Sequence, residues 1–158
     1  MPFITAQPQA GSTVHLLGNL LTFRATAATT EGELSLIDTV TAPGQGSPPH
    51  LQRDDVEAFY VLEGRYEFTL GDTTAEQGPG AFLFVPRGLP HQFRNPGTEP
   101  ARMLIINVPG GLHERFFLEA GDPVPAAKAS AFPAMSPPDV PRLLAAASRY
   151  GIEVLLPA

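Results

Sequence analysis

Residues 80–95 have the sequence GAFLFVPRGLPHQFRN, which carries the clearest sign of a fold in the chain. The apolar run Ala81–Val85 is typical of a buried strand. Pro86–Pro90 predicts a turn, because proline fixes φ and glycine adopts backbone conformations that other residues avoid. His91 and Phe93 then share one face of the next strand, since side chains alternate along a strand. The stretch predicts two strands joined by a tight turn, with a histidine directed to the interior.

A second group of polar side chains has the spacing Gly44-x5-His50-x-Gln52-x4-Glu57-x6-Gly64. His50 and Gln52 point the same way on a strand, but Glu57 has the wrong parity for the same unbroken strand. A turn or bulge must intervene, and the charged residues 53–55 are the expected place for it. Both stretches are therefore expected to direct polar groups toward one interior, an arrangement that suits a metal ion.

These two stretches resemble the two conserved motifs of the cupin superfamily. Residues 80–95 match the second motif at every position. Residues 44–64 match the first motif except at Gln52, which stands where most metal-binding cupins have a second histidine. The resemblance covers residues 33–108 closely. It implies an all-β fold with a single cupin barrel, also described as a double-stranded β-helix or jelly roll.

The rest of this region consists of short apolar or alternating segments separated by turn residues, which is typical of strands. Eight or so short strands favour a closed all-β barrel or sandwich without any reference to a family. The chain has no internal repeat, so we expect one barrel. The expected strands include residues 20–28, 33–40, 57–62, 65–70, 81–85 and 101–108.

After residue 108 the pattern changes from strands to helices. Leu112–Ala120 has an apolar helical stripe that ends at Gly121, and a last helix is expected over Val140–Tyr150. We therefore expect a barrel domain over residues 1–121 and a Pro/Ala-rich connector with a C-terminal helix over residues 122–158. This short helical C-terminal extension is expected outside the barrel, where it seals one side or helps form a dimer.

Composition excludes several classes of function. The chain has 158 residues, a net charge of −6, one lysine against nine arginines, and no cysteine. One domain is expected from the length, and nucleic acid is disfavoured because phosphate binding needs a clustered basic surface. Without cysteine there is no disulfide, thiolate nucleophile, zinc finger or iron–sulfur cluster. No apolar run approaches a membrane span and no signal peptide is evident, so we expect no membrane partner and a cytoplasmic location. By analogy with small cupins, we expect a homodimer.

The predicted metal site consists of His50, Gln52, Glu57 and His91. Two imidazoles, a carboxylate and an amide oxygen suit one divalent ion of Fe, Mn, Ni, Co or Zn, with open positions for a small-molecule substrate or water. A neutral amide is a poorer donor than imidazole, so Gln52 ligates weakly, orients a water or leaves a three-ligand site. Metal affinity is therefore expected to be lower than in a three-histidine cupin.

Each candidate residue has a structural alternative. His91 alone is compatible with a half-buried histidine bonded to a carbonyl, and His50 alone with a loop histidine. Their positions in the two spaced motifs favour the interpretation that both are metal ligands. Glu57 needs a partner, because an unpaired buried carboxylate is costly. The alternative to a metal or base role for Glu57 is an ion pair with Arg53 or Arg87. Other side chains are assigned to the surface or packing (His15, His113), to turn structure (Asn95) or to the core (Phe59, Phe82, Phe84, Phe93).

Residues 57–64, 84–95 and 109–117 are similar to small single-domain bacterial cupins related to quercetin 2,3-dioxygenases. That resemblance implies a dioxygenase of an enolisable or flavonol-like small molecule, with Glu57 as both metal ligand and catalytic base. Two other functions remain open. One is an isomerase or lyase that uses the metal as a Lewis acid without oxygen. The other is a cupin that binds a small ligand without turnover, which the departure at Gln52 from the usual ligand set favours.

Overall fold

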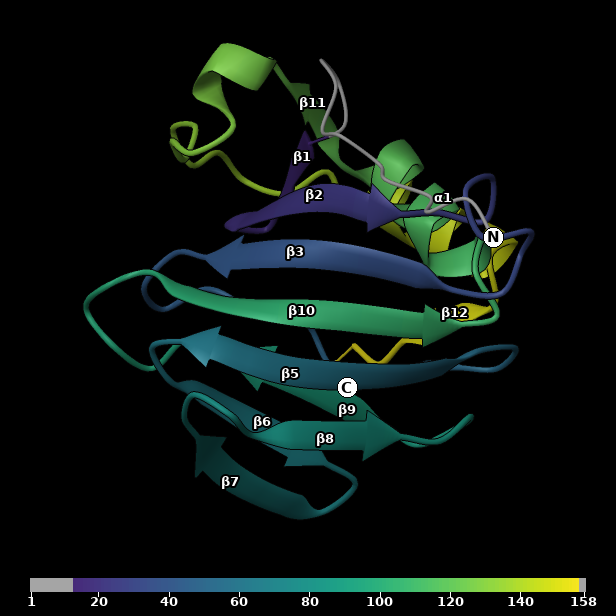
Figure 1. Cartoon of the computed structure of the whole chain (residues 1–158), viewed down its shortest axis with the longest axis horizontal. Coiled ribbons are helices and arrows are strands. Elements are labelled where there is room, and N and C mark those ends of the chain that lie inside the picture. The colour runs from purple at the N-terminus through teal and green to yellow at the C-terminus, as the bar shows by residue number, and fades with distance from the viewer. Residues whose placement is uncertain (1–12, 157–158) are drawn as a thin grey trace, which may run out of the picture.

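A computed structural model describes residues 13–156, which form two antiparallel β-sheets packed on each other (Figure 1). The seven-stranded sheet has the order β11-β1-β2-β3-β10-β5-β8, and the five-stranded sheet has the order β12-β4-β9-β6-β7. The elements are β1 (Thr13–Leu16), β2 (Asn19–Ala25), β3 (Ser35–Thr41), β4 (His50–Gln52), β5 (Val56–Glu63), β6 (Tyr66–Leu70), β7 (Thr73–Gln77), β8 (Phe82–Val85), β9 (His91–Arg94), β10 (Ala101–Val108), α1 (Leu112–Ala120), β11 (Asp122–Val124), the 3-10 helix η1 (Ala126–Lys128), α2 (Val140–Arg149) and β12 (Ile152–Val154).

The core lies between the two sheets. Alternate residues of β10 and β5 face it, among them Met103, Ile105 and Phe59, all of which are buried. The ring of Phe59 packs on Phe68 of the opposite sheet, with centroids 5.1 Å apart. Burying one face of each sheet in this way removes apolar surface from water and holds the sheets together. The predicted all-β jelly-roll barrel with a short helical C-terminal extension is confirmed.

Two short strands were not predicted, and both have weak sequence signals. Thr73–Gln77 forms β7 at the edge of the five-stranded sheet, although all five of its residues are polar or small and mostly exposed. Asp122–Val124 forms β11, which pairs with β1 within the segment that was expected to be an extended connector. Short edge strands bury little apolar surface, so their sequences need no alternation of hydrophobic and polar residues.

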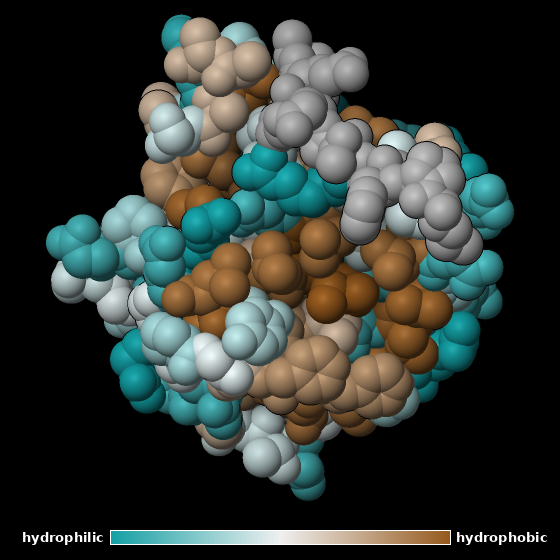
Figure 2. All heavy atoms as spheres, viewed as in Figure 1, coloured by the Kyte–Doolittle hydropathy of each residue, from teal (hydrophilic) through white to brown (hydrophobic). Residues whose placement is uncertain are grey.

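The outer face of the seven-stranded sheet carries an apolar patch, visible as the brown band across Figure 2. Phe82 and Phe84 of β8 belong to it, with exposed fractions of 61% and 54%. Their assignment to the core is therefore wrong, whereas Phe59 and Phe93 are buried as expected. A short apolar run does not indicate which of its residues face outward. In β8, Val85 points inward, whereas Phe82 and Phe84 point to the opposite face.

The C-terminal extension packs on the barrel and completes it. The side chain of Asp139 accepts a hydrogen bond from the Arg142 backbone N–H and caps α2. Ala146 and Ala147 of α2 are buried in the same core as the sheets. β12 pairs with β4, which places Ile152 opposite Gln52 and Val154 opposite His50. The extension thus reaches the strand that carries two of the predicted ligands. Within residues 13–156, no helix is long and apolar enough to cross a membrane.

Candidate metal centre

Three of the four predicted ligands meet inside the barrel. His50 on β4 and His91 on β9 are register partners in the five-stranded sheet, and their ring centroids lie 4.3 Å apart. Glu57 reaches the same point from β5 of the facing sheet. A ligand atom from each of these three buried residues lies within 4.8 Å of the other two. Two distant stretches of sequence, residues 44–64 and 80–95, therefore converge on one place, as their spacing predicted.

Backbone carbonyls determine which nitrogen of each histidine is free. Nδ1 of His50 lies 2.9 Å from the Pro48 carbonyl oxygen, and Nδ1 of His91 lies 2.8 Å from that of Leu89. A carbonyl only accepts, so each Nδ1 carries a proton and donates it. The Nε2 atoms are consequently the ones available to a metal, in the tautomer that ligating histidines commonly have.

Charges and burial set the protonation states that a metal site requires. Burial, together with nearby His91, lowers the pKa of His50 to about 4. Burial would raise the pKa of Glu57, but the electrostatic interaction with His113 and the hydrogen bond from His91 outweigh it and lower this pKa to about 2. Burial likewise opposes protonation of His91, yet its hydrogen bond to Glu57, 3.0 Å from Nε2 to Oε1, raises its pKa. His50 as a neutral imidazole and Glu57 as an ionised carboxylate are thus in place at neutral pH, whereas a metal ion would have to displace the proton that His91 shares with Glu57.

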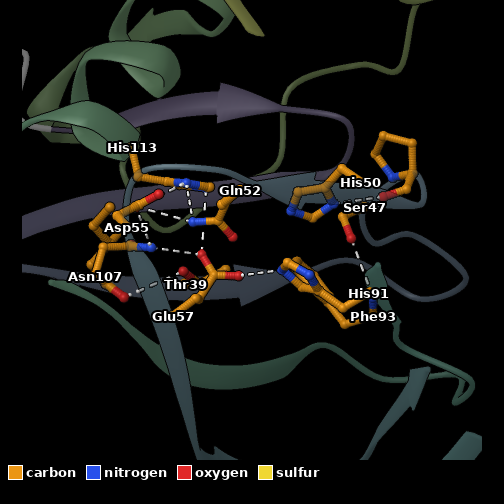
Figure 3. A network of polar contacts seen from close by, with 12 residues as sticks. Thr39, Ser47, His50, Gln52, Asp55, Glu57, His91, Phe93, Asn107 and His113 are labelled. Atoms are coloured by element: carbon orange, nitrogen blue, oxygen red, sulfur yellow. Dashed lines mark hydrogen bonds and ion pairs between the residues drawn. The ribbon is translucent and has the colours of Figure 1, made fainter. Parts of the chain in front are cut away.

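Gln52, the fourth predicted ligand, faces the same interior from β4 and is 2% exposed. Its Nε2 lies 3.1 Å from Oδ2 of Asp55 and 3.0 Å from Nδ1 of His113 (Figure 3). Its Oε1 is buried and has no hydrogen-bond partner among the described residues. Whether Gln52 binds the metal stays a prediction at this point.

His113, which was assigned to the surface or to packing, is a member of the site. It is 4% exposed, and its Nε2 lies 3.5 Å from Oε2 of Glu57. It comes from α1, outside both motifs, so no motif spacing could find it. One signal was available: His113 is four residues before Phe117 on the apolar stripe of the predicted helix, and the two rings pack edge to face.

Asp55 and Asn107 were also missed. Asp55 lies in the segment 53–55 that was expected to be a turn between strands, and it is 1% exposed because it turns inward to Gln52. Asn107 of β10 donates from Nδ2 to Oε2 of Glu57 at 2.9 Å and to Oδ2 of Asp55 at 3.3 Å. Strand parity could have found Asn107, because it follows Met103 and Ile105 on the inward face.

The contacts of Glu57 and Asn95 decide between their structural alternatives. Arg53 pairs with Glu153 rather than with Glu57, and no ion pair joins Glu57 to an arginine within residues 13–156. Asn95 has the expected structural role, since its side chain bonds the backbone of Thr41, Gly97 and Glu99. The burial of Glu57 is therefore explained by histidines and an asparagine.

The donor atoms fit a divalent metal ion. Metal–nitrogen and metal–oxygen bonds of about 2.0–2.2 Å place two ligand atoms of one ion within roughly 4 Å of each other, close to the separation found here. The set of two Nε2 atoms and a carboxylate is the 2-His-1-carboxylate combination in ligand type. The buried, unpartnered Oε1 of Gln52 is a further oxygen with nothing else to bind.

An apolar pocket borders these ligands on the side of the C-terminal extension. Its polar lining includes His50, Glu57 and His113, and among the described residues no lysine or arginine lines it. The pocket is narrow, since only about 50 Å³ of it can hold the centre of a water molecule. Its apolar wall includes Leu21, Ile105, Phe116, Phe117, Leu143 and Ile152.

A family model matches the central part of the barrel. Residues 38–107, less than half of the chain, match the model described as a cupin domain, and this part of the barrel is similar to that family. The matched residues contain His50, Gln52, Glu57 and His91, but they exclude His113 and the extension that lines the pocket.

Related proteins match the same central part of the chain. An uncharacterized protein of Methanocaldococcus jannaschii is 30% identical over 80 residues, 51% of this chain and 64% of that protein. Polyketide synthase CurC of Streptomyces cyaneus is 37% identical over 84 residues, 51% of this chain and 51% of CurC. The chain thus spans between half and two thirds of the length of these curated relatives.

Solved structures show the same fold. An RmlC-like cupin from Shewanella frigidimarina has a TM-score of 0.56 at 17% identity, over 66% of this chain and 86% of that one. A predicted oxalate decarboxylase from Thermotoga maritima has a TM-score of 0.55 at 16% identity, over 57% of this chain and 79% of that one. At these identities the likeness concerns the fold alone.

Proposed function

We propose that this cupin is a metal-dependent enzyme that removes a proton from a small, neutral, enolisable molecule, and that the reaction it catalyses is a dioxygenation. The observation that carries the proposal is the position of Glu57. Its carboxylate is ionised, lies among the metal-ligand nitrogens, and forms part of the wall of an apolar pocket. A carboxylate in such a place can bind a metal and accept a proton from a molecule in the pocket.

The metal would be held by His50, Glu57 and His91. A divalent ion there would supply Lewis acidity, which lowers the pKa of an enol hydroxyl and favours the reaction of the enolate with dioxygen. Asn107 donates to Oε2 of Glu57, and Nε2 of His91 lies 3.0 Å from Oε1. Oε1, the oxygen that faces the ligand nitrogens, would take the substrate proton once its contact with His91 is given up. The surrounding phenylalanines and leucines exclude water, which strengthens these electrostatic interactions.

The pocket lining supports a neutral substrate. A phosphate or a second carboxylate on the substrate would need a cationic side chain, and the described lining has none. The narrow space favours a small enol over a molecule of flavonol size. The name of the relative CurC, a polyketide synthase, is in accord with this chemistry, because polyketide chains carry carbonyl groups that enolise readily.

The proposal is tested by two rates measured on the same metal-loaded protein. The protein is stripped with a chelator, loaded in turn with Fe, Mn, Ni, Co and Zn, and offered small 1,3-dicarbonyl compounds and enols. We expect oxygen uptake with at least one metal, and solvent deuterium exchange at the acidic carbon when oxygen is removed. Exchange without any oxygen uptake would replace the dioxygenase by an isomerase or lyase. Ligand binding with neither rate would leave a binding protein.

A further inference from the structure

The amide of Gln52 is fully engaged on its nitrogen side. Its two N–H groups point at Oδ2 of Asp55, 3.1 Å away, and at Nδ1 of His113, 3.0 Å away. A carboxylate oxygen accepts, so the nitrogen and not the oxygen of the amide must face Asp55. Because the second N–H is donated to Nδ1 of His113, that ring nitrogen is the acceptor and the ring N–H is the one on Nε2. The orientation of the amide is therefore fixed by two partners on two different elements.

The oxygen side of the same amide is free. Oε1 of Gln52 is buried without a hydrogen-bond partner among the described residues, a state that is costly for a polar atom. In Figure 3 this oxygen points away from Asp55 and His113, toward the space between His50, Glu57 and His91. The missing partner of Oε1 is thus on the side where the metal ligands meet.

The same network also restricts Glu57. Nε2 of His113, which carries the proton, lies 3.5 Å from Oε2 of Glu57, and Asn107 donates to this oxygen at 2.9 Å. Asn107 gives its other N–H to Asp55. The amide and imidazole N–H groups of Gln52, Asn107 and His113 are all directed to acceptors within the network. One oxygen of Gln52 and one oxygen of Glu57 remain for the metal.

We propose that Oε1 of Gln52 is the fourth protein donor to the metal, and that His113 and Asp55 are positioning residues that keep this oxygen turned toward it. The proposal rests on the metal site described above and deepens it. An amide is a weak donor, and a fixed orientation compensates because no rotation has to be lost when the ion binds. His113 lies outside residues 38–107, so this part of the site comes from helix α1 and not from the matched residues.

The first test measures the affinity of the purified chain for Mn²⁺ and Co²⁺ by titration calorimetry after chelation. Gln52→Leu removes the donor, and His113→Phe removes the acceptor that orients it while keeping a ring against Phe116 and Phe117. We expect both variants to bind about 10- to 100-fold more weakly, the usual effect of losing such a partner. His113→Asn can present a side-chain oxygen near the position of Nδ1, and we expect it to recover most of the affinity. His15→Phe, a change at a histidine outside the site, is the control and should bind as the wild type does.

The second test separates a lost ligand from a loosened fold. Water proton relaxation of the Mn²⁺-loaded protein increases when an additional water binds the ion. We expect the relaxation rate per bound Mn²⁺ to be higher in Gln52→Leu and His113→Phe than in the wild type. In His113→Asn it should stay near the wild-type value. Unchanged affinity and relaxation in Gln52→Leu would overturn the donor assignment although the metal site stands. A change in Gln52→Leu but none in His113→Phe would overturn the positioning role. A wild-type chain that binds none of the metals would instead contradict the proposed function itself.

Discussion

The two faces of the seven-stranded sheet differ in a way that β5 shows within a few residues. Glu57 and Phe59 point inward and are 2% and 1% exposed, whereas Tyr60 points outward and is 39% exposed. Both faces carry apolar side chains, so hydrophobicity does not distinguish them. What distinguishes them is the number of specific polar partners. Glu57 contacts His91, Asn107 and His113, whereas the outer aromatic residues Tyr60, Phe82 and Phe84 are exposed.

This comparison predicts that equal changes on the two faces have unequal effects. An inward side chain is fixed by packing and by polar contacts, and removing it leaves a cavity or an unpaired group. An outward side chain in the single chain has solvent as its neighbour, and removing it changes little.

The largest effect is expected for Glu57→Gln. The substitution retains the shape of the side chain but removes the charge that binds the metal and the group that accepts the proton. We expect turnover, measured by the oxygen uptake and deuterium exchange assays above, to fall by about 10²- to 10⁴-fold, with weaker metal retention measured by elemental analysis. Tyr60→Phe on the opposite face of β5 is the matched control and should keep both. Full turnover in Glu57→Gln would refute the base assignment.

A smaller effect is expected for core packing. Phe59→Ala removes a ring that packs on Phe68 and Phe93, and we expect it to lower the free energy of unfolding by about 3–5 kcal/mol. Phe82→Ala removes a ring of the same size from the outer face of β8, and its effect should stay within about 0.5 kcal/mol in the monomer. Urea unfolding at low protein concentration compares the two. Equal losses of unfolding free energy in Phe59→Ala and Phe82→Ala would mean that Phe82 is packed against other residues in the monomer.

Much of the barrel, and the convergence of His50, Glu57 and His91 on one place, was predictable because local rules determined them. The parity of His50 and Gln52, the turn before Glu57 and the strand over Ala101–Val108 follow from side-chain alternation and from turn residues, which act over a few positions. The family motifs then placed both histidines and the carboxylate in one interior.

The remaining parts of the site depend on contacts between segments far apart in sequence. His113 reaches Glu57 because of how α1 packs on the barrel. The apolar stripe of α1 indicates that His113 is buried, but not that it meets Glu57. Asp55 resembles an exposed turn residue until Gln52 and Asn107 are seen to donate to it. The domain boundary at residue 121, the cytoplasmic location and the homodimer stay predictions.

On the outer face, the polar group most dependent on its partners is Asp38 of β3. Burial would raise the pKa of Asp38. Hydrogen bonds and charge from Arg102, and to a smaller extent from Arg24, outweigh burial and lower this pKa below its usual value. A carboxyl with a lower pKa in the folded state stabilises the fold above its unfolded pKa and loses that contribution as pH falls through the folded pKa. The contribution is about 1 kcal/mol, because both arginines are more than a third exposed and solvent screens them.

We therefore expect Asp38→Asn to be less stable than the wild type at pH 7 and the difference to shrink below about pH 4. Urea unfolding at a series of pH values measures it. Thr69→Ala, at a half-buried position of the five-stranded sheet, serves as a control without a titrating group. A difference in unfolding free energy between wild type and Asp38→Asn that is constant from pH 7 to pH 3 would contradict the lowered pKa of Asp38.

The smallest effect on the single chain, and the sharpest test of the outer face, concerns the predicted homodimer. The charged side chains beside the apolar patch pair with one another, as Arg102 does with Asp38 and Glu63, so the face has little unbalanced charge to oppose a second copy. We expect the dimer to bury Phe82 and Phe84 on this face rather than to form only through strand edges and the C-terminal extension. Light scattering after size exclusion should then give a dimer mass for the wild type and a monomer mass for Phe84→Glu. Leu118→Glu, which places the same charge at an exposed apolar position of α1, should remain dimeric. A dimer that survives Phe84→Glu but not Leu118→Glu would place the contact on helix α1, and a monomeric wild type would leave the apolar face without this explanation.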